Sequence, residues 1–253
     1  MKKFLFLSVI FMAIACVCYS QDIDADTINK SDENNLKQGY WKEDNKKEVH
    51  KGNYVDGKRE GSWTIYHENG LVKRVEYYIN GKKDGVVIVI DRRGYLVKEI
   101  HYKDDLKHGI EKKFAAGGRL QEVSNYKMGK LNGENRIYYQ TTFNLQEESF
   151  YENGKRQGLT KWYDEKGRIV AEYNYEQGLF EGMQKTYYTN GNVMTEQLYE
   201  MNRPVEEYVE YYDDGIIKIK GQYLKGEKNG IWYEYGTDGK EINKTKYKKG
   251  IEL

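Results

Sequence analysis

The chain has 253 residues, and its 41 lysines and arginines against 40 aspartates and glutamates give a formal net charge of +1. This balance excludes a protein that is drawn to nucleic acid or to an anionic membrane by its overall charge. Only 38% of the residues are hydrophobic and the mean hydropathy is −0.92, while 26 glycines and 25 tyrosines stand against a single proline. Because a thick central core would be hard to fill from this composition, we expect a thin architecture rich in tyrosine.

The first 20 residues have the pattern of a secretory signal peptide. Lys2 and Lys3 form a basic start, and the apolar run from Phe4 to Val17 is shorter than the roughly 20 residues that a membrane-spanning helix needs. We therefore expect a bacterial export signal, a mature chain without a transmembrane span, and a periplasmic, outer-envelope or secreted location.

Processing of this segment has two open alternatives. Cleavage after Ser20 would release a soluble chain, whereas the run that ends at Cys16 resembles a lipoprotein signal in which a lipid anchor is attached to that thiol. Cys16 and Cys18 are the only cysteines, so the rest of the chain has no disulfide framework. Removal of residues 1–20 takes away two positive charges, which changes +1 to 1 − 2 = −1. Residues 21–38 form an acidic segment that we expect to be a flexible leader.

Nine tyrosines follow at a nearly constant interval. The interval is 24 residues, except for one of 25 between Tyr126 and Tyr151, and a fixed period of this length is typical of repeat architectures. We number each of these tyrosines as position 1 of a unit; they are Tyr54, Tyr78, Tyr102, Tyr126, Tyr151, Tyr175, Tyr199, Tyr223 and Tyr247.

Three further positions of the unit are glycine in nearly every copy. Position 4 is Asp105 or Asn202 in the two copies that lack glycine, and because Asp and Asn tolerate a positive φ best after Gly, we expect a left-handed turn residue there. The glycines with this structural role are Gly57, Gly81, Gly129, Gly154, Gly178, Gly226 and Gly250 at position 4, Gly61, Gly85, Gly109, Gly133, Gly158, Gly182 and Gly230 at position 8, and Gly70, Gly94, Gly118, Gly167, Gly191, Gly215 and Gly239 at position 17.

Each unit is expected to be a β-hairpin. A β-prone stretch such as residues 62–67 lies between positions 8 and 17, and it is followed by Asn69-Gly70 or its equivalent at positions 16 and 17. An Asn-Gly pair favours a two-residue type I′ turn, because both central residues of that turn need a positive φ. A second strand then returns to the next tyrosine, and a Tyr-x-x-Gly-x-x-x-Gly segment links one hairpin to the next.

The pattern Tyr-x-x-Gly-Lys-x-x-Gly-x-Trp-x-x-Tyr-x-x-x-Gly, which runs from Tyr54 to Gly70, resembles the MORN repeat, and its bacterial variant most of all. The resemblance covers residues 39–253, with a shortened cap at 39–53, eight units at 54–246 and a partial unit at 247–253. It implies an all-β fold, an elongated single-layer antiparallel sheet of tandem β-hairpins with a 24-residue period. Domains of this variant are often labelled antitoxins of toxin–antitoxin systems.

One face of this sheet is predicted to carry a stripe of cations and aromatic rings. With a type I′ turn, position 11 pairs with position 22 and position 13 with position 20, so that positions 11 and 13 share a face. The candidate surface stripe is Lys112, Phe114, Arg136, Tyr138, Lys161, Tyr163, Lys185 and Tyr187. Such a stripe would suit an acidic partner, but position 22 is glutamate opposite three of the four cations (Glu148, Glu172 and Glu196), which favours solvated ion pairs.

The opposite face is expected to be the packed one. It would hold the repeated tyrosine of position 1, which we expect to be structural, together with an aliphatic series at position 19. That series is Val72, Leu96, Leu120, Leu145, Ile169, Val193 and Ile217.

Two units break the pattern. The fourth replaces its glycine turn by residues 140–144 and is one residue longer, and the seventh has Asn202, Pro204 and Glu206 where other units have glycine or a free amide. Two interpretations stay open. These units either bend the array or contact a partner, or they are repeat decay without consequence.

No residue pattern points to catalysis. The histidines at 50, 67, 101 and 108 fall at different positions of the unit, so we expect surface residues and no metal site. The sequence contains no Gly-x-Ser-x-Gly turn and no phosphate-binding loop, and the units leave no room for a catalytic domain. We therefore expect no catalytic residues and no cofactor.

These observations predict a non-enzymatic exported binding or scaffold protein that presents a long repeat surface to a protein partner and not to nucleic acid. Some sixteen strands, each about 4.8 Å from the next, would give a surface of roughly 75–80 Å. The alternative is an antitoxin or immunity protein that neutralises a cognate toxin.

Overall fold

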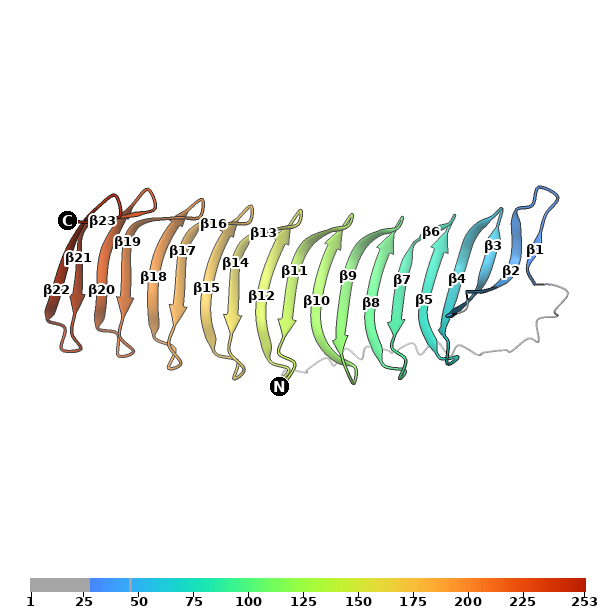
Figure 1. Ribbon diagram of the computed structural model, residues 1–253, viewed down its shortest axis with the longest axis horizontal. Coiled ribbons are helices and arrows are strands. Elements are labelled where there is room, and N and C mark those ends of the chain that lie inside the picture. The colour runs from blue at the N-terminus through green and yellow to red at the C-terminus, as the bar shows by residue number, and fades with distance from the viewer. Residues whose placement is uncertain (1–27, 46) are drawn as a thin grey trace, which may run out of the picture.

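The protein is one long antiparallel sheet of hairpins that follow each other in chain order. The computed structural model describes residues 28–45 and 47–253, so the signal segment, Cys16 and the start of the leader lie outside the described residues. Figure 1 shows the strands side by side from β1 at one end to β23 at the other, without closure into a barrel. No helix or second sheet covers either face of the described part. The expected single-layer all-β fold is confirmed.

The strands have the following bounds: β1 (Lys30–Ser31), β2 (Lys37–Asp44), β3 (Glu48–Val55), β4 (Lys58–His67), β5 (Val72–Ile79), β6 (Lys82–Lys83), β7 (Gly85–Ile90), β8 (Leu96–Lys103), β9 (Leu106–Ala115), β10 (Arg119–Lys127), β11 (Lys130–Tyr138), β12 (Leu145–Glu152), β13 (Lys155–Arg156), β14 (Gly158–Tyr163), β15 (Ile169–Glu176), β16 (Leu179–Phe180), β17 (Gly182–Tyr187), β18 (Val193–Glu200), β19 (Arg203–Tyr211), β20 (Ile217–Leu224), β21 (Glu227–Tyr235), β22 (Glu241–Lys248) and β23 (Ile251–Glu252).

The tight two-residue turn lies at positions 3 and 4 of the unit. Between β3 and β4, Val55 pairs with Lys58, and the two residues between them, Asp56 and Gly57, have φ values of 49° and 74°. Two consecutive positive φ values define a type I′ turn, whose twist matches that of the flanking strands. The two position-4 residues that are not glycine, Asp105 and Asn202, both have a φ of 66°.

The Asn-Gly turn at positions 16 and 17 is of a different type from the one expected. Gly70 has a φ of 82°, but Asn69 does not share the positive φ. The amide of Gly70 donates to the carbonyl of His67 at 2.9 Å, and the amide of His67 donates to the carbonyl of Leu71 at 2.8 Å. This is a three-residue loop, a type I turn followed by a left-handed glycine. The type I′ prediction for this turn is wrong. The type I′ turn and the three-residue loop both place glycine after asparagine, and they differ in the conformation of the asparagine.

The longer loop changes the strand register beside it. Thr64 pairs with Val75, as expected for positions 11 and 22, but Tyr66 pairs with Val72, so position 13 faces position 19 and not position 20. Directly paired residues share a face. The aliphatic series therefore lies on the same face as the aromatic residues of position 13, and the expectation that it packs with the repeated tyrosines is wrong.

The repeated tyrosines do lie on the more buried face, which we call the tyrosine face and which carries positions 1, 6, 10, 12, 21 and 23. Trp63 and Ile65 are fully buried on it, and Tyr54 and Tyr78 are 8% and 7% exposed. Gly52 makes room for the first of these rings: a Cβ on it would lie 2.3 Å from Cδ2 of Trp63. The same arrangement recurs at the other end of the array, where Trp232 covers Gly221.

Backbone hydrogen bonds also join each unit to the next outside the strands. The amide of position 4 donates to the carbonyl of position 6 in the preceding unit, as Gly81 does to Arg59 at 2.9 Å. Gly226 makes the same bond to Pro204 at 3.0 Å, because proline retains its carbonyl. Pro204 lies inside β19 and pairs with Tyr199, so the seventh unit keeps the sheet continuous.

The ordered array begins before residue 39. Residues 28–38, which the sequence assigns to the leader, contain β1, and this strand pairs antiparallel with the first residues of β2. The carboxylate of Asp32 stabilises the turn between them, since it accepts hydrogen bonds from the amides of Asn34 and Leu36 at 2.9 Å each. At the other end, β23 pairs with the last residues of β22.

Replacement of Gly52 by alanine tests the packing of Trp63. We expect Gly52→Ala to lower the free energy of unfolding by about 1–3 kcal/mol, as overpacking of a close-packed site does. Urea denaturation followed by tryptophan fluorescence measures the loss. In a Trp63→Leu background the smaller side chain leaves space, so the same substitution should have a smaller effect. An equal loss in both backgrounds would show that the indole is not the obstacle.

Candidate functional site

The predicted stripe lies on the face opposite the tyrosines, which we call the stripe face and which carries positions 9, 11, 13, 19, 22 and 24. Every cation of the stripe forms an ion pair there. The pairs are Lys112 with Glu99 (3.1 Å), Arg136 with Glu148 (3.0 Å), Lys161 with Glu172 (3.4 Å) and Lys185 with Glu196 (2.7 Å). Three of them are the cross-strand pairs expected from the sequence. Lys112, which faces Val123 on β10, finds its acid on β8 instead.

One ring of the stripe also bonds to these acids. The hydroxyl of Tyr187 donates to Glu172 at 2.7 Å, and burial together with this carboxylate raises the pKa of Tyr187. The hydrogen bond from Lys185 lowers the pKa of Glu196. The acids and cations of the stripe thus satisfy each other, and the stripe has little free charge to offer a polyanion.

The tyrosine face contains a second row of cations, at position 6, which the sequence analysis did not single out. Each lies over one or more aromatic rings: Arg59 is 4.1 Å from the ring centroid of Trp63, and Lys228 is 4.1 Å from that of Trp232. The row is Lys37, Arg59, Lys83, Lys107, Arg156 and Lys228. A cation at a fixed distance after five of the repeated tyrosines was visible in the sequence, but only the register shows that the cation and the tyrosine point to one face.

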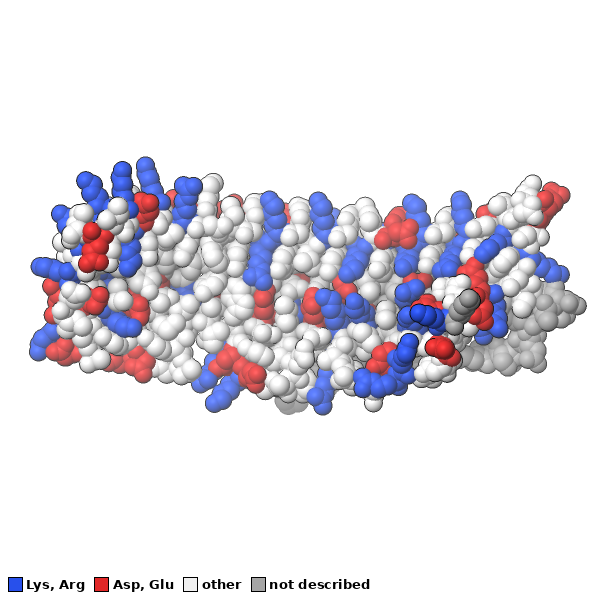
Figure 2. All heavy atoms as spheres, viewed as in Figure 1, with Lys and Arg blue, Asp and Glu red and all other residues white. Residues whose placement is uncertain are grey.

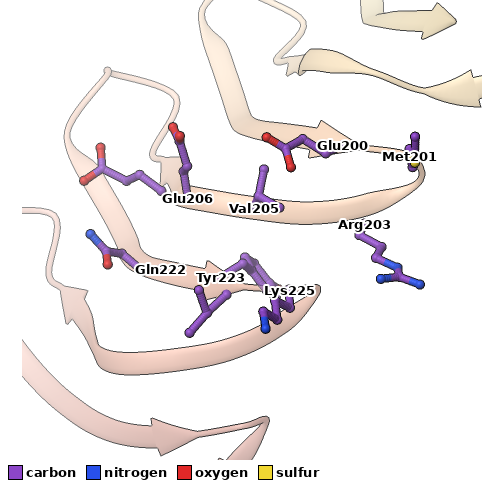
Figure 3. A pocket seen from close by; sticks show the side chains of 10 residues that line it. Glu200, Met201, Arg203, Val205, Glu206, Gln222, Tyr223 and Lys225 are labelled. Carbon is purple, nitrogen blue, oxygen red and sulfur yellow. The ribbon is translucent and has the colours of Figure 1, made fainter.

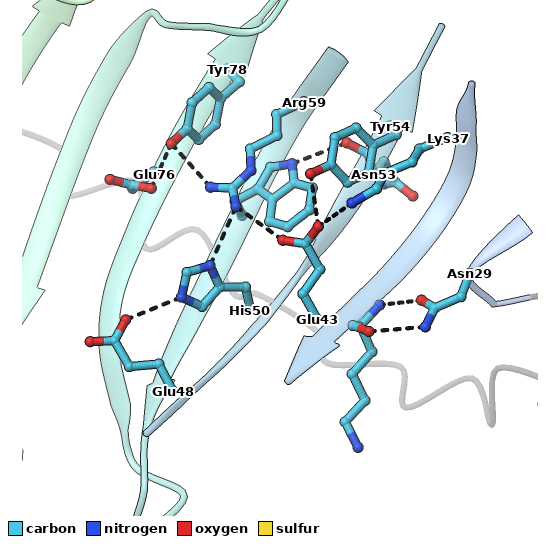
Figure 4. Close-up of polar contacts among 12 residues, drawn as sticks. Asn29, Lys37, Glu43, Glu48, His50, Asn53, Tyr54, Arg59, Glu76 and Tyr78 are labelled. Atoms are coloured by element: carbon cyan, nitrogen blue, oxygen red, sulfur yellow. Dashed lines mark hydrogen bonds and ion pairs between the residues drawn. The ribbon is translucent and has the colours of Figure 1, made fainter. Parts of the chain in front are cut away.

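At the N-terminal end, acidic side chains join the cations of this row in a network of hydrogen bonds and ion pairs (Figure 4). Arg59 donates to Glu43 at 3.1 Å and to the hydroxyl of Tyr78 at 3.4 Å, and its Nη2 lies 3.3 Å from Nδ1 of His50. Tyr54 donates to the same Glu43 at 3.0 Å. Only 14% of the His50 side chain is exposed, so this histidine lies within the network and not at an open surface as expected.

Glu76 is the most deeply buried acid of the network, with 1% of its side chain exposed. It lies 2.9 Å from both Arg74 and Lys83 and accepts a hydrogen bond from Tyr78 at 2.7 Å. Burial alone would raise the pKa of Glu76, but these partners lower it below its ordinary value of 4.5. Burial and the bond to Glu76 raise the pKa of Tyr78 to about 12.

Three units have no cation at position 6: the fourth has Leu131, and the successive sixth and seventh have Phe180 and Pro204. A cavity of about 160 Å³ lies beside Phe180 and Pro204 on the tyrosine face, and we call it the aromatic pocket. Its main lining residues are Tyr173, Phe180, Gln197, Tyr199, Tyr208 and Tyr223. Figure 2 shows mostly uncharged side chains over the middle of β15, β17 and β18, whereas acidic and basic side chains mix over the strands toward the N-terminal end.

A larger and more open pocket, of about 930 Å³, lies between the turns that follow β18 and β20 (Figure 3). It contains Met201, which is 74% exposed, and charged side chains of both signs, among them Glu206 and Arg203. Figure 3 shows that the charged ends point in different directions. They do not converge on a common point, as the groups of a catalytic site must.

The two irregular units keep the hydrogen-bonded pattern. In the fourth, Phe143 takes the left-handed conformation that glycine has elsewhere, with a φ of 63°, and Arg119 lies 4.5 Å from its ring centroid. In the seventh, Asn202 accepts a hydrogen bond from the amide of Phe180 at 2.6 Å, and Glu206 has a φ of 59°. Each exception therefore has a local contact or conformation that replaces the missing glycine.

Among the described residues, no group of three or more His, Cys, Asp or Glu side chains is placed to hold a metal ion. Within residues 28–45 and 47–253 there is also no helix of the length and apolarity that a membrane span requires.

The buried position of Glu76 predicts a pH dependence of stability. Because its folded pKa is lowered, its contribution is present above the unfolded value of about 4.5 and is lost as the pH falls through the folded pKa. At pH 7 we expect Glu76→Gln to lower the free energy of unfolding by about 1–3 kcal/mol. Urea titrations from pH 7 to pH 3 should show this difference shrinking as the acid is protonated. A difference that stays constant with pH would contradict the assignment.

Comparison with known proteins gives one family. The model of the MORN repeat variant matches residues 59–80, 156–177 and 180–201. No curated protein matches the sequence. Among solved structures, a chain from the "Crystal Structure of TcdB2-TccC3-Cdc42" is similar over 80% of this chain at 12% identity, with a TM-score of 0.22, which is too low to support an argument. This chain spans 14% of the length of that one. The chain thus contains three repeats that match the MORN variant, within one continuous sheet of hairpins.

Proposed function

We propose that the chain is an exported, non-enzymatic binding or scaffold protein, and that its stripe face holds an extended segment of a protein partner. The observation that carries the proposal is a row of exposed apolar side chains along this face, which we call the apolar row. Its members occupy positions 9 and 24 and are between 38% and 47% exposed. They are Tyr77, Val86, Ile110, Phe150, Leu159, Met183 and Ile231.

The apolar row recurs along the sheet and is interrupted where position 9 is a glutamate, in the fourth and seventh units. Positions 9 and 24 pair across neighbouring strands, as Met183 does with Leu198, so their side chains stand next to each other. Scattered apolar side chains on a surface need no explanation, but exposed apolar residues that recur at the same positions of several repeats are typical of an interaction surface. No second layer covers this face in the described part of the chain.

The spacing of the row favours one kind of occupant. Two strands at about 4.8 Å each separate equivalent residues of neighbouring units by about 9.6 Å. Three residues of a polyproline II segment make one turn and span about 9.3 Å, so every third side chain points the same way. In an extended β-strand, by contrast, residues three apart point to opposite sides. A polyproline II segment that runs along the sheet with an apolar residue at every third position would therefore meet successive units in turn.

The charges beside the row support the same partner. The stripe cations are held by their own glutamates, so the face attracts neither a polyanion nor a polycation strongly. Export, which rests on residues 1–20, would place this surface where it meets envelope or extracellular proteins.

A random peptide library displayed on phage and selected against the purified chain tests the proposal. We expect enrichment of peptides with apolar residues at i, i+3 and i+6. Leu159→Asp and Met183→Asp should each weaken binding of the enriched peptides about tenfold or more, because a charge then faces the apolar side chain of the peptide. Biolayer interferometry with synthetic peptides measures the change.

Ser62→Asp is the matched control, because it makes the same change at position 9 of a unit whose residue is already polar. It should leave binding unchanged. Enriched peptides without a three-residue period, or peptides that bind the Leu159→Asp and Met183→Asp variants as well as the unchanged chain, would refute the proposal.

A further inference from the structure

The aromatic pocket on the tyrosine face has the chemistry of a ligand site that is separate from the stripe face. In five of the eight units the cation of position 6 lies above the rings, as Arg156 does 5.4 Å from the ring centroid of Trp162. Phe180 puts a ring in that place, 5.4 Å from the ring centroid of Tyr199, whereas Pro204 has no long side chain to extend over the following rings. The cavity of about 160 Å³ lies beside these two residues.

The walls of the pocket are aromatic rings held in fixed positions. Phe180 packs between Tyr173 and Tyr199, with both ring centroids 5.4 Å from its own. On the other side, the rings of Tyr208 and Tyr223 lie 6.3 Å apart at 87°. The pocket is therefore formed in the unliganded chain, and a ligand would not need to order these side chains.

One buried polar atom of the pocket has no partner. Gln197 is 6% exposed, and its Nε2 donates to the carbonyls of Leu198 and Val205 at 2.8 Å each. Because both partners are acceptors, the amide nitrogen must face them, and Oε1 is left buried without a hydrogen bond. A buried acceptor without a partner is costly, and a hydroxyl donor from a ligand would satisfy it.

A second pair of polar groups lines the same cavity. The hydroxyls of Thr186 and Thr195 lie 2.6 Å apart, so one donates to the other. The proton of the accepting hydroxyl remains available for a ligand oxygen. The pocket thus combines ring faces with one free acceptor and one free donor, and none of its lining residues is charged.

We propose that the aromatic pocket binds a single neutral sugar ring of a glycan. The C–H faces of a pyranose pack against aromatic rings, while its hydroxyl groups both donate and accept hydrogen bonds, which matches Gln197 and the threonine pair. A pocket that encloses a whole drug-sized ligand has about 300–1,000 Å³. The aromatic pocket is smaller, so it holds one ring while the rest of the glycan lies outside. An anionic sugar or a phosphate would find no cation in the lining.

Saturation-transfer difference NMR on the purified chain tests this proposal. The probes are the methyl glycosides of glucose, galactose, mannose and N-acetylglucosamine, with methyl glucuronide as the charged comparison and N-acetyltyrosine amide as a peptide comparison. We expect transfer to at least one neutral glycoside and weaker transfer to the last two probes. Phe180→Arg removes one ring of the pocket wall and puts the cation of position 6 in its space, so it should weaken binding about tenfold or more.

Leu131→Arg is the matched control, because it makes the same kind of change at position 6 of the fourth unit, outside the pocket. It should bind like the unchanged chain. If Phe180→Arg shifts the urea midpoint, Pro204→Lys fills the same space and replaces it. The proposal fails if no neutral glycoside gives a signal, if filling the cavity leaves the signal intact, or if the glucuronide or the tyrosine amide binds better. The Leu159→Asp variant of the stripe face should retain sugar binding, which separates this proposal from that of a protein partner.

Discussion

The rest of this structure depends on a backbone that can turn back on itself twice in every unit without leaving the sheet. Both turns need left-handed residues: two in succession at positions 3 and 4, and one at position 17. For residues other than glycine, asparagine and aspartate this conformation is unfavourable. The glycine period therefore sets the architecture, and the two position-4 exceptions, Asp105 and Asn202, are residues that tolerate it and use their carboxylate or amide to bind the neighbouring unit.

A single-layer sheet has no opposing layer against which to pack, so it must bury its side chains with its own. The tyrosine face does this with rings that pack mostly edge to face or tilted and are covered by long cations, whose aliphatic stems add apolar contact while their charges reach carboxylates. Glu76 is an example of this arrangement. Its carboxylate is almost fully buried and is surrounded by two cations and a hydroxyl. The low hydrophobic content of the chain and its near-neutral charge both follow from this kind of core.

The two faces offer different chemistry as a result. On the stripe face the acids and cations neutralise each other. The apolar row is the exposed feature of this face that has no covering partner within the described chain. On the tyrosine face the cations of position 6 cover the rings, and a cavity lies beside Phe180 and Pro204, where two successive units lack that cation. Function in a repeat protein is expected at such interruptions, because a site needs groups that the repeat itself does not supply.

The sequence by itself determined the period, the hairpins, the left-handed position 4, the ion pairs of position 11 with position 22, and the likeness of its repeats to the MORN variant, because these depend on local turn chemistry and on residues that recur in phase. It did not decide which turn is type I′, since Asn69-Gly70 suits two loops that differ by one residue. That single residue moves the aliphatic series to the other face. The burial of His50, the cation row over the rings and the aromatic pocket were also beyond the sequence, because each arises from side chains on different strands that only the tertiary register brings together.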